Sequence, residues 1–283
     1  MIITKLQGGL GNQLFQYALG RFLSYKLNVP LKLDIGYYQN DKKRECLLNN
    51  FMISALIATE EEIKKIKSES VFEKIKNLFF KRKNEQETFV ESYSFNQEVL
   101  NLPDNTYLEG FWQNEKYFKD IESIIRKEIV LKESLPFKAN LLIELINNVN
   151  SVSIHIRRGD YILPKYQKIF YPITIEYYQK AIFLINKKVP NTHFFIFSDD
   201  IEWSKTLFFP KNITYVDSSY GLKDFQELMV MSLCKHNITT NSTFSWWAAW
   251  LNSNQNKIVI TPKKWSIYQS VHKDLIPETW IKL

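Results

Sequence analysis

The feature that most constrains this chain is the repeated alternation of short apolar strands with longer helical patterns. In the C-terminal half, strands are expected at 151–156, where apolar and polar residues alternate, and at 193–197 and 213–216, with helical patterns at 174–187 and 223–233. Strands that follow one another through a helix run parallel, and a series of such units forms a sheet with helices on both faces. The sequence therefore predicts an α/β fold with a parallel, doubly wound sheet.

The N-terminus shows the same alternation. A strand expected at 2–6 leads through a glycine turn at 7–13 into a helix with a broad apolar face, which Pro30 ends, and a second strand follows at 31–34. The glycines do not form the dinucleotide-binding fingerprint, because Leu14 stands where its third glycine would be. What remains is a tight turn at a helix start, which either approaches a ligand closely or only caps the helix.

Length and composition limit the possibilities further. A chain of 283 residues with 45% apolar content can form about two domains or one large one, and we place a junction so that the halves are 1–148 and 149–283. The net charge of +7 is compatible with an anionic ligand or an anionic membrane surface and identifies neither. Cys46 and Cys234 fit no disulfide framework, and the four histidines have no zinc-binding spacing. The histidines therefore predict no zinc site, and a reducing compartment is the simplest inference from the cysteines.

No apolar run is long enough for a signal peptide or a membrane span, which predicts a cytoplasmic protein. The stretch 64–83 carries eight Lys or Arg residues with apolar residues at roughly helical spacing. Such a segment is either the solvated face of a surface helix, which is the more common case, or a helix lying on acidic lipid headgroups at the inner face of the membrane.

Polar side chains follow three of the C-terminal strands at the point where each leaves the sheet. The three groups are His155, Arg157, Arg158 and Asp160; Ser198, Asp199 and Asp200; and Asn241, Ser242 and Thr243. Ligands of open α/β sheets bind outside the carboxyl ends of the strands. The fixed charge of Arg157, with Asp160 to hold its guanidinium, suits a phosphate or diphosphate. For this motif taken alone, an ordinary surface salt bridge is the alternative.

The last group precedes a helical segment rich in tryptophan. Asn241 or Ser242 is expected to cap that helix, and the first N–H groups of the helix, at its positive dipole end, can hold a phosphate. The cap needs no ligand, and the two roles are compatible. Trp246, Trp247 and Trp250 are expected to pack in the core rather than to stack on a substrate.

The segment 109–118 places aromatic rings on both sides of Gln113 and Asn114. These rings could form a platform for a sugar, although core packing of Phe111 and Trp112 is the favoured interpretation. The chain has no phosphate-binding P-loop motif, which disfavours nucleotide hydrolysis by that route.

Several of these segments, in order, resemble the motif set of glycosyltransferase family 11, the α-1,2-fucosyltransferases. The matching segments are Gly8–Ala18, Glu109–Gln113 with Lys116–Phe118, His155–Tyr161, and Cys234–His236 with Asn241–Leu251. The resemblance implies a GT-B architecture, in which two Rossmann-like halves face each other across a cleft. It also implies inverting, metal-independent transfer of L-fucose from GDP-β-L-fucose to O2 of a terminal galactose. The acceptor would be a surface polysaccharide or oligosaccharide, free or lipid-linked.

The resemblance also implies roles for individual residues. Arg157 would contact the diphosphate, Arg158 would bind the donor beside it, and Glu227 would accept hydrogen bonds from the guanine edge, which offers two donors to one carboxylate. The remaining expected donor contacts are Gly9, Gly11, Asn12, Gln13, Asp199, Asn241, Ser242 and Thr243. The donor half would be 149–283 and the acceptor half 1–148.

The mechanism needs a group to take the proton of the acceptor hydroxyl, and no candidate stands out. Asp34, Glu109 and His155 are each possible, and His155 has a contact with the donor or a packing role as alternatives. Metal-dependent glycosyltransferases commonly carry an Asp-x-Asp pair, whereas Asp199 and Asp200 are adjacent. Arginine and a helix dipole could replace the cation. The rival functions are transfer of another sugar or to another acceptor, and nucleic-acid binding, for which no known motif appears.

Overall fold

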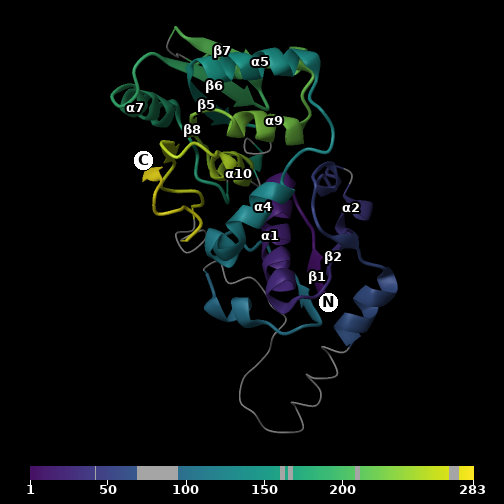
Figure 1. Cartoon of the computed structure of the whole chain (residues 1–283). Coiled ribbons are helices and arrows are strands. Elements are labelled where there is room, and N and C mark those ends of the chain that lie inside the picture. Colours follow the sequence, from purple (N-terminus) through teal and green to yellow (C-terminus); the bar gives the residue numbers. More distant parts are fainter. Residues whose placement is uncertain (42, 69–94, 160–162, 165–167, 208–210, 268–273) are drawn as a thin grey trace. The chain divides into compact units, whose positions relative to one another are not determined.

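The computed structural model describes residues 1–41, 43–68, 95–159, 163–164, 168–207, 211–267 and 274–283 (Figure 1). The chain divides into two compact units, which we call unit 1 (Met1–Val130) and unit 2 (Leu131–Leu283). Each unit contains its own sheet, and every strand pairing within the two sheets is parallel. The predicted α/β class with two parallel-sheet halves is therefore confirmed.

Unit 1 is built on a four-stranded sheet of order β3-β2-β1-β4. Its strands are β1 (Ile2–Lys5), β2 (Leu31–Asp34), β3 (Leu56–Ile57) and β4 (Thr106–Leu108). Its labelled α-helices are α1 (Leu10–Leu27), α2 (Tyr37–Asn40) and α4 (Glu122–Glu128), and residues 60–68 are helical as well. Its 3-10 turns are η1 (Leu48–Asn50), η2 (Gln97–Asn101), η3 (Glu115–Tyr117) and η4 (Lys119–Ile121). The expected strand–helix–strand opening is present, since β1 pairs with β2 after α1. Asn28 ends α1 in the left-handed conformation, with a φ of 54°, before Pro30 is reached.

Unit 2 is built on a six-stranded sheet of order β10-β9-β8-β5-β6-β7. Its strands are β5 (Asn150–Ile156), β6 (Thr192–Ser198), β7 (Ile213–Val216), β8 (His236–Ile238), β9 (Val259–Thr261) and β10 (Ile281–Lys282). Its helices are α5 (Phe137–Asn148), α7 (Ile175–Asn186), α8 (Ile201–Lys205), α9 (Asp224–Ser232) and α10 (Thr243–Leu251), with a 3-10 turn η6 (Ser218–Tyr220). From β5 the chain proceeds outward through β6 and β7, and then returns to β8 on the other side of β5. The strand order therefore reverses between β5 and β8, which is where ligands of such sheets bind.

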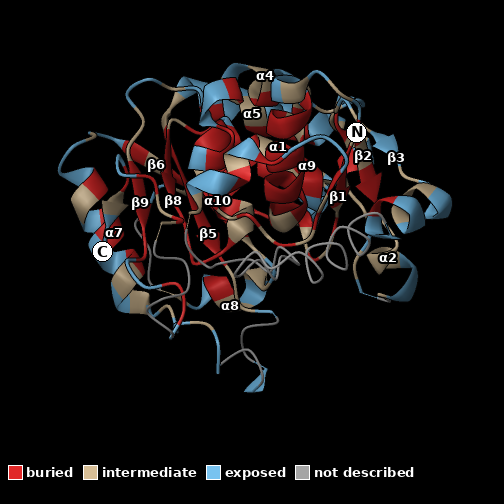
Figure 2. Cartoon of the chain, turned by 90° about the horizontal axis from the view of Figure 1, so that it is seen from below, coloured by how far each residue is buried: buried red, intermediate tan, exposed pale blue. Residues whose placement is uncertain are grey.

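The boundary between the units comes before α5 rather than after it. Helix α5 packs against β5 and η6, both in unit 2, so the segment 131–148 belongs with the C-terminal unit. The inner strands β5, β6, β8 and β9 of the unit 2 sheet are buried along most of their length (Figure 2), whereas the edge strands β7 and β10 are only partly covered. In contrast, Leu56 and Ile57 on the edge strand β3 are exposed.

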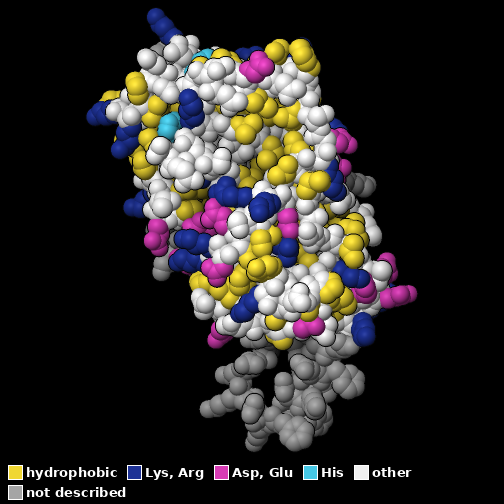
Figure 3. All heavy atoms as spheres, viewed as in Figure 1, with side chains coloured by type: hydrophobic (Ala, Val, Ile, Leu, Met, Phe, Trp, Pro, Cys, Tyr) yellow, Lys and Arg dark blue, Asp and Glu magenta, His cyan; other side chains and the backbone are white. Residues whose placement is uncertain are grey.

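Charged side chains of both signs occur on the face seen in Figure 3, so the positive net charge is not gathered into one uniform field there. Of the basic stretch 64–83, residues 64–68 continue a helix that begins at 60, and the rest lies outside the described residues. No helix in the described part of the chain is both long enough and apolar enough to cross a membrane.

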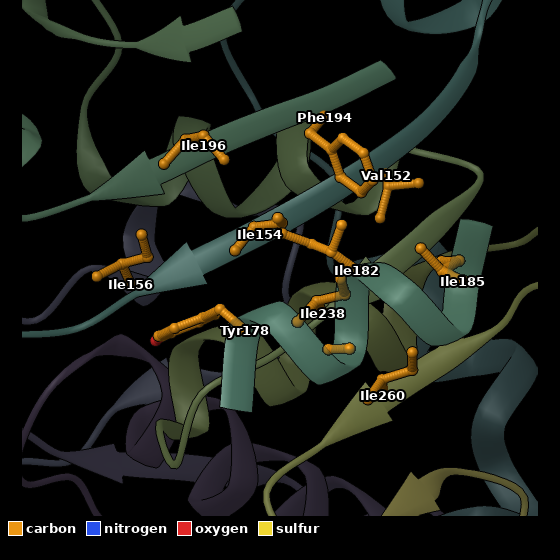
Figure 4. Packing of buried hydrophobic residues seen from close by; sticks show 11 residues of the cluster. Val152, Ile154, Ile156, Tyr178, Ile182, Ile185, Phe194, Ile196, Ile238 and Ile260 are labelled. Carbon is orange, nitrogen blue, oxygen red and sulfur yellow. The ribbon is translucent and has the colours of Figure 1, made fainter. Parts of the chain in front are cut away.

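The core of unit 2 lies between its sheet and α7 (Figure 4). Tyr178, Ile182 and Ile185 of α7 pack on a continuous apolar surface of four strands, formed by Val152, Ile154, Ile156, Phe194, Ile196, Ile238 and Ile260. Burial of an aliphatic side chain of this size contributes about 1.5–3 kcal/mol. On the other face, β5 carries Ser151, Ser153 and His155, which are buried as well. With both faces of β5 covered, the ligand-accessible part of the strand is its carboxyl end.

Candidate functional site

The carboxyl ends of β5 and β6 carry two arginines and two aspartates that pair in register. Ile156 lies opposite Ser198 in the parallel ladder, so the next residues of the two strands are neighbours. Arg157 Nη1 is 2.9 Å from Asp199 Oδ2, and Arg158 Nη1 is 2.7 Å from Asp200 Oδ2. The backbone N–H of Arg158 also donates to Asp199 Oδ1 at 2.9 Å. The expected convergence of these two polar strand ends is therefore present.

The two ion pairs orient the arginines more than they stabilise the fold. The side chains of Arg157 and Asp199 are 32% and 23% exposed, and pairs with this much solvent contact contribute about 1 kcal/mol or less. A guanidinium has five N–H donors, so one contact with a carboxylate does not use the whole group. The salt bridges expected under the simpler interpretation are real, and they hold two cations at the strand ends.

Arg158 is held from two sides. Asp200 accepts its hydrogen bond and also accepts from Trp203 N at 3.0 Å as the N-cap of α8. The pKa of Asp200 is lowered, first by that backbone N–H and then by Arg158. The Trp203 ring lies under the guanidinium, with the Arg158 Cζ atom 4.6 Å from the ring centroid. Sequence reasoning missed Trp203, whose position three residues after a capping Asp is the signal that could have found it.

Gly159 makes the close approach of Asp199 possible. A Cβ atom at this position would lie 2.5 Å from Asp199 Oδ2, so no larger residue fits without a shift. Asp160, the residue predicted to orient the arginines, lies outside the described residues. Among the residues that the structure describes, Asp199 and Asp200 hold the guanidiniums, and this role of Asp199 adds to the donor contact predicted for it.

His155 ends the buried part of β5 and is 5% exposed. Burial, and secondarily the charge of Arg157, lowers its pKa to about 3, so the imidazole is neutral at ordinary pH. Its ring lies 5.4 Å from that of Phe244 at the start of α10, and its Nδ1 atom is buried without a hydrogen-bond partner.

Glu227, on α9, belongs to the same electrostatic neighbourhood. Burial, and after it the nearby charges of Asp224 and Asp199, together raise its pKa to about 7. The influence of Asp199 connects Glu227 to the arginine cluster. When the pKa of a carboxyl group lies near neutral pH, a ligand that donates hydrogen bonds to it can shift it from the protonated to the ionised form.

The turn between β8 and α10 forms the third polar strand end. Ser242 occupies the N-cap position of α10, and its own side chain makes no capping hydrogen bond. The Asn241 side-chain amide donates to the backbone carbonyls of Tyr171 at 2.8 Å and Trp265 at 3.0 Å. Asn241 thus ties two distant loops to this turn. Thr243 begins the helix, whose first-turn N–H groups cannot be satisfied within the helix itself.

In unit 1, the glycine turn is held by hydrogen bonds from a buried side chain of α1. Gly8 has a φ of 80° and Gly9 is the N-cap of α1, with Gly11 in its first turn. The fully buried Gln13 donates to the carbonyls of Gly8 at 3.2 Å and Glu45 at 2.8 Å, and accepts from Leu47 N at 2.9 Å. Its amide is therefore used to shape the turn. Asn12 Oδ1 accepts from Gln113 Nε2 at 2.9 Å, which joins this turn to the segment after β4.

The two unit 1 candidates for a proton acceptor are both engaged. Asp34 accepts from Tyr107 Oη at 2.6 Å and from Gly36 N at 2.9 Å, and Glu109 pairs with Lys5 at 2.6 Å. The partner Tyr107 was not anticipated. Within the described residues, no group of three or more His, Cys, Asp or Glu side chains is arranged to hold a metal ion.

The chain matches the family described as Glycosyl transferase family 11 over residues 1–283. A whole-length match of this kind, on a chain with two parallel α/β units, defines a glycosyltransferase. The chain belongs to glycosyl transferase family 11.

Its relatives include two proteins of Escherichia coli. The chain is 32% identical to an alpha-1,2-colitosyltransferase, with 100% of this chain and 99% of the relative covered. It is 33% identical to the O-antigen biosynthesis glycosyltransferase WbnK, with 98% of this chain and 99% of the relative covered. Human galactoside alpha-(1,2)-fucosyltransferase 1 is 24% identical, with 51% of this chain and 42% of the relative covered. Among solved structures, fucosyltransferase NodZ from Bradyrhizobium has a TM-score of 0.49 at 14% identity, with 87% of this chain and 91% of that chain covered.

Proposed function

We propose that this protein transfers L-fucose from GDP-β-L-fucose to O2 of a terminal galactose, forming an α-1,2 linkage with inversion and without a metal ion. The acceptor is a galactose-terminated surface glycan. The observation that supports this most is the pair Arg157 and Arg158, held by carboxylates at the strand ends beside the reversal of strand order, in a chain of family 11. We assign the donor to unit 2 and the acceptor to unit 1.

In the proposed reaction, galactose O2 attacks C1 of fucose while the bond from C1 to the β-phosphate oxygen breaks. The electron pair of that bond leaves with GDP, and the O2 proton passes to a base. Negative charge grows on the diphosphate as the sugar becomes oxocarbenium-like, so cations that are already oriented lower the barrier. Arg157 and Arg158 are the cations, and the first-turn N–H groups of α10, after Asn241 and Ser242, bind the same group.

Glu227 is the proposed contact for guanine. The N1 and N2 groups of the base donate two hydrogen bonds, which one ionised carboxylate can accept together. Because the pKa of Glu227 is raised to about 7, donor binding favours its ionised form. His155 has a pKa of about 3, which makes it a weak base at neutral pH and favours a hydrogen-bonding contact with the donor over proton transfer.

A colitose donor is the second candidate, favoured by the whole-length similarity to an alpha-1,2-colitosyltransferase. Colitose lacks the 3-hydroxyl of fucose. A site that hydrogen-bonds a substrate hydroxyl rejects the analogue without it by about 10⁴ or more, whereas a site that leaves the hydroxyl uncontacted accepts both sugars. The ratio of kcat/KM for GDP-fucose and GDP-colitose therefore decides between the two.

The test incubates the purified chain with GDP-fucose or GDP-colitose and a panel of galactosides in EDTA, and determines the linkage of the product by NMR. We expect an α-1,2-fucosyl product. Calorimetric titration with GDP and UDP accompanies the assay. A preference for UDP, or an enzyme that is inactive in EDTA and is restored by Mg²⁺ or Mn²⁺, would contradict the proposal.

A further inference from the structure

The segment that follows β4 adopts a strained turn. Trp112 has a φ of 56°, in the left-handed region that a bulky residue rarely enters, and Asn114 N donates to Trp112 O at 2.8 Å across a three-residue turn. The Trp112 ring folds back over Gly110, where an added Cβ would lie 2.9 Å from the indole. Such strain persists only where surrounding contacts enforce it, and it is concentrated at functional sites.

Those contacts connect the turn to the start of α1. Gln16 Nε2 donates to the Gly110 carbonyl at 3.0 Å, and Gln113 Nε2 donates to Asn12 Oδ1 at 2.9 Å. Because β4 pairs directly with β1, the turn and the glycine loop leave neighbouring strands of one sheet at the same edge. The turn therefore lies beside the glycine loop, within unit 1.

Three consecutive side chains of this turn each keep a buried polar atom without a hydrogen-bond partner. The atoms are Trp112 Nε1, Gln113 Oε1 and Asn114 Nδ2. Trp112 and Asn114 are only 4% and 3% exposed. The orientation of the Asn114 amide is fixed, because its Oδ1 accepts from Lys116 N at 2.9 Å as the N-cap of η3. Buried polar atoms are normally paired, so three in succession indicate a partner outside the chain.

The chemistry of these atoms indicates which ligand would pair with them. They comprise two donors and one acceptor, none of them charged, which suits hydroxyl groups because each hydroxyl both donates and accepts. Aromatic rings adjoin them, with Trp112 and Tyr117 edge to face at 6.0 Å. A neutral, hydroxyl-rich ring meets these requirements, whereas a diphosphate does not.

We propose that Trp112, Gln113 and Asn114 form a binding subsite for the sugar ring of the acceptor, a galactoside. This assignment rests on the proposed function and names the unit 1 residues that would contact its acceptor. The three polar atoms are shielded from solvent in this structure, so the sugar reaches them through a shift of the turn, which the strain at Trp112 makes less costly.

Two variants each remove one donor while keeping the surrounding structure. Trp112→Phe removes the indole N–H and keeps an aromatic ring, and Asn114→Ser removes the amide donor and keeps a good N-cap residue for η3. Trp247→Phe is the matched control, because it makes the same substitution at a buried tryptophan of α10, which belongs to unit 2. Thermal unfolding of each variant establishes that it folds.

The experiment measures KM for methyl β-galactoside and for GDP-fucose, and the affinity for methyl β-galactoside directly by saturation-transfer NMR. We expect each unit 1 variant to raise the galactoside KM and dissociation constant about three- to tenfold, with the GDP-fucose KM unchanged. Trp247→Phe should leave both galactoside values unchanged.

Unchanged galactoside binding in both unit 1 variants, or an equal loss in Trp247→Phe, would overturn the subsite. A rise in the GDP-fucose KM alone would move the contact to the donor sugar and so overturn the assignment to the acceptor. The NMR measurement needs no turnover, so the proposed function and the subsite can fail separately. If the unit 1 variants transfer fucose as well as the unaltered chain does, only the subsite is refuted. If the unaltered chain transfers no fucose but the variants still weaken galactoside binding, only the proposed function is refuted.

Discussion

At the scale of single residues, the candidate site depends on how each ionisable group is held. Arg157 and Asp199 come from strands 42 positions apart in the sequence, and parallel register brings them to 2.9 Å. His155 is two positions before Arg157, yet its imidazole stays neutral because it is buried and faces that cation. Burial first, and neighbouring acids second, raise the pKa of Glu227 to about 7. The same few residues thus combine a permanent cation, a neutral ring and a titratable acid.

The first prediction concerns Arg157. Arg157→Lys keeps the positive charge but cannot reproduce the planar two-pronged contact with phosphate oxygens. We expect kcat to fall about 100-fold or more, nearly as far as in Arg157→Ala, because the contact is strongest as charge develops on the leaving group. Single-turnover kinetics with GDP-fucose measure this, and an unchanged unfolding temperature serves as the control. Near-normal turnover of the lysine variant would contradict a bidentate role.

The second prediction concerns pH. The pKa of Glu227 is raised to about 7, and the proposed contact with guanine requires the ionised carboxylate. Below pH 7 a proton must therefore be released on binding, so the GDP dissociation constant should rise as pH falls, approaching about tenfold per pH unit, and should be flat above about pH 8. Calorimetry between pH 5.5 and about 8.5 measures this. Glu227→Gln should bind GDP weakly and without that slope, and a flat profile in the unaltered chain would exclude the assignment.

At the scale of elements, the size of a single side chain decides how closely a helix packs on its sheet. α1 crosses β1 at Gly20, where an added Cβ would collide with Thr4 Oγ1 and come within 2.8 Å of Leu31 Cδ1. Contact this close lets α1 cover the unit 1 sheet tightly, and it determines where the glycine loop at the start of the helix is placed.

Gly20→Ala tests this packing. In an exposed helix the change would stabilise the protein by about 1 kcal/mol, but here the methyl group overpacks the contact with β1, at a cost of about 1–3 kcal/mol. We expect a net loss of stability by denaturant unfolding. Thr4→Ala removes the colliding oxygen, so the double variant should recover much of the loss. Additive effects of the two substitutions would show that the collision is not the cause.

At the scale of the whole molecule, the chain consists of two units with separate sheets, and we assign the diphosphate and guanine contacts to unit 2. A ligand stabilises the part of a protein that binds it, by about 2.7 kcal/mol at a concentration one hundred times Kd. Saturating GDP should therefore raise the unfolding temperature and slow hydrogen exchange chiefly in unit 2, around the ends of β5 and β6 and at the start of α10. Slower exchange confined to unit 1 would reverse the assignment of the donor.

The main elements could be predicted from the sequence because they depend on local patterns. The expected helices at 174–187 and 223–233 correspond to α7 and α9, and the strand at 193–197 corresponds to β6. The tight turn at Gly8 and Gly9 was likewise visible, since a φ of 80° at Gly8 favours glycine. The polar residues at the strand ends could also be located, because they follow directly after the apolar strand patterns.

Expectations that depended on one specific tertiary contact agreed with the structure only in part. Ser242 was placed correctly at the start of α10, but its side chain makes no capping hydrogen bond, and the Asn241 side-chain amide donates to the carbonyls of Tyr171 and Trp265. The unit boundary lies before α5 because that helix packs on β5. Each outcome depends on segments far away in the sequence, which local pattern does not specify.

The sequence by itself determined the α/β class, the order of strands and helices, and the presence of arginines and acids at strand ends, because apolar periodicity and turn residues act over a few positions. Only the tertiary structure decided that Asp199 and Asp200 hold Arg157 and Arg158, that burial shifts the pKa values of His155 and Glu227, and that Trp112 is strained. These features arise from strand register and burial, which exist only once distant segments have packed together.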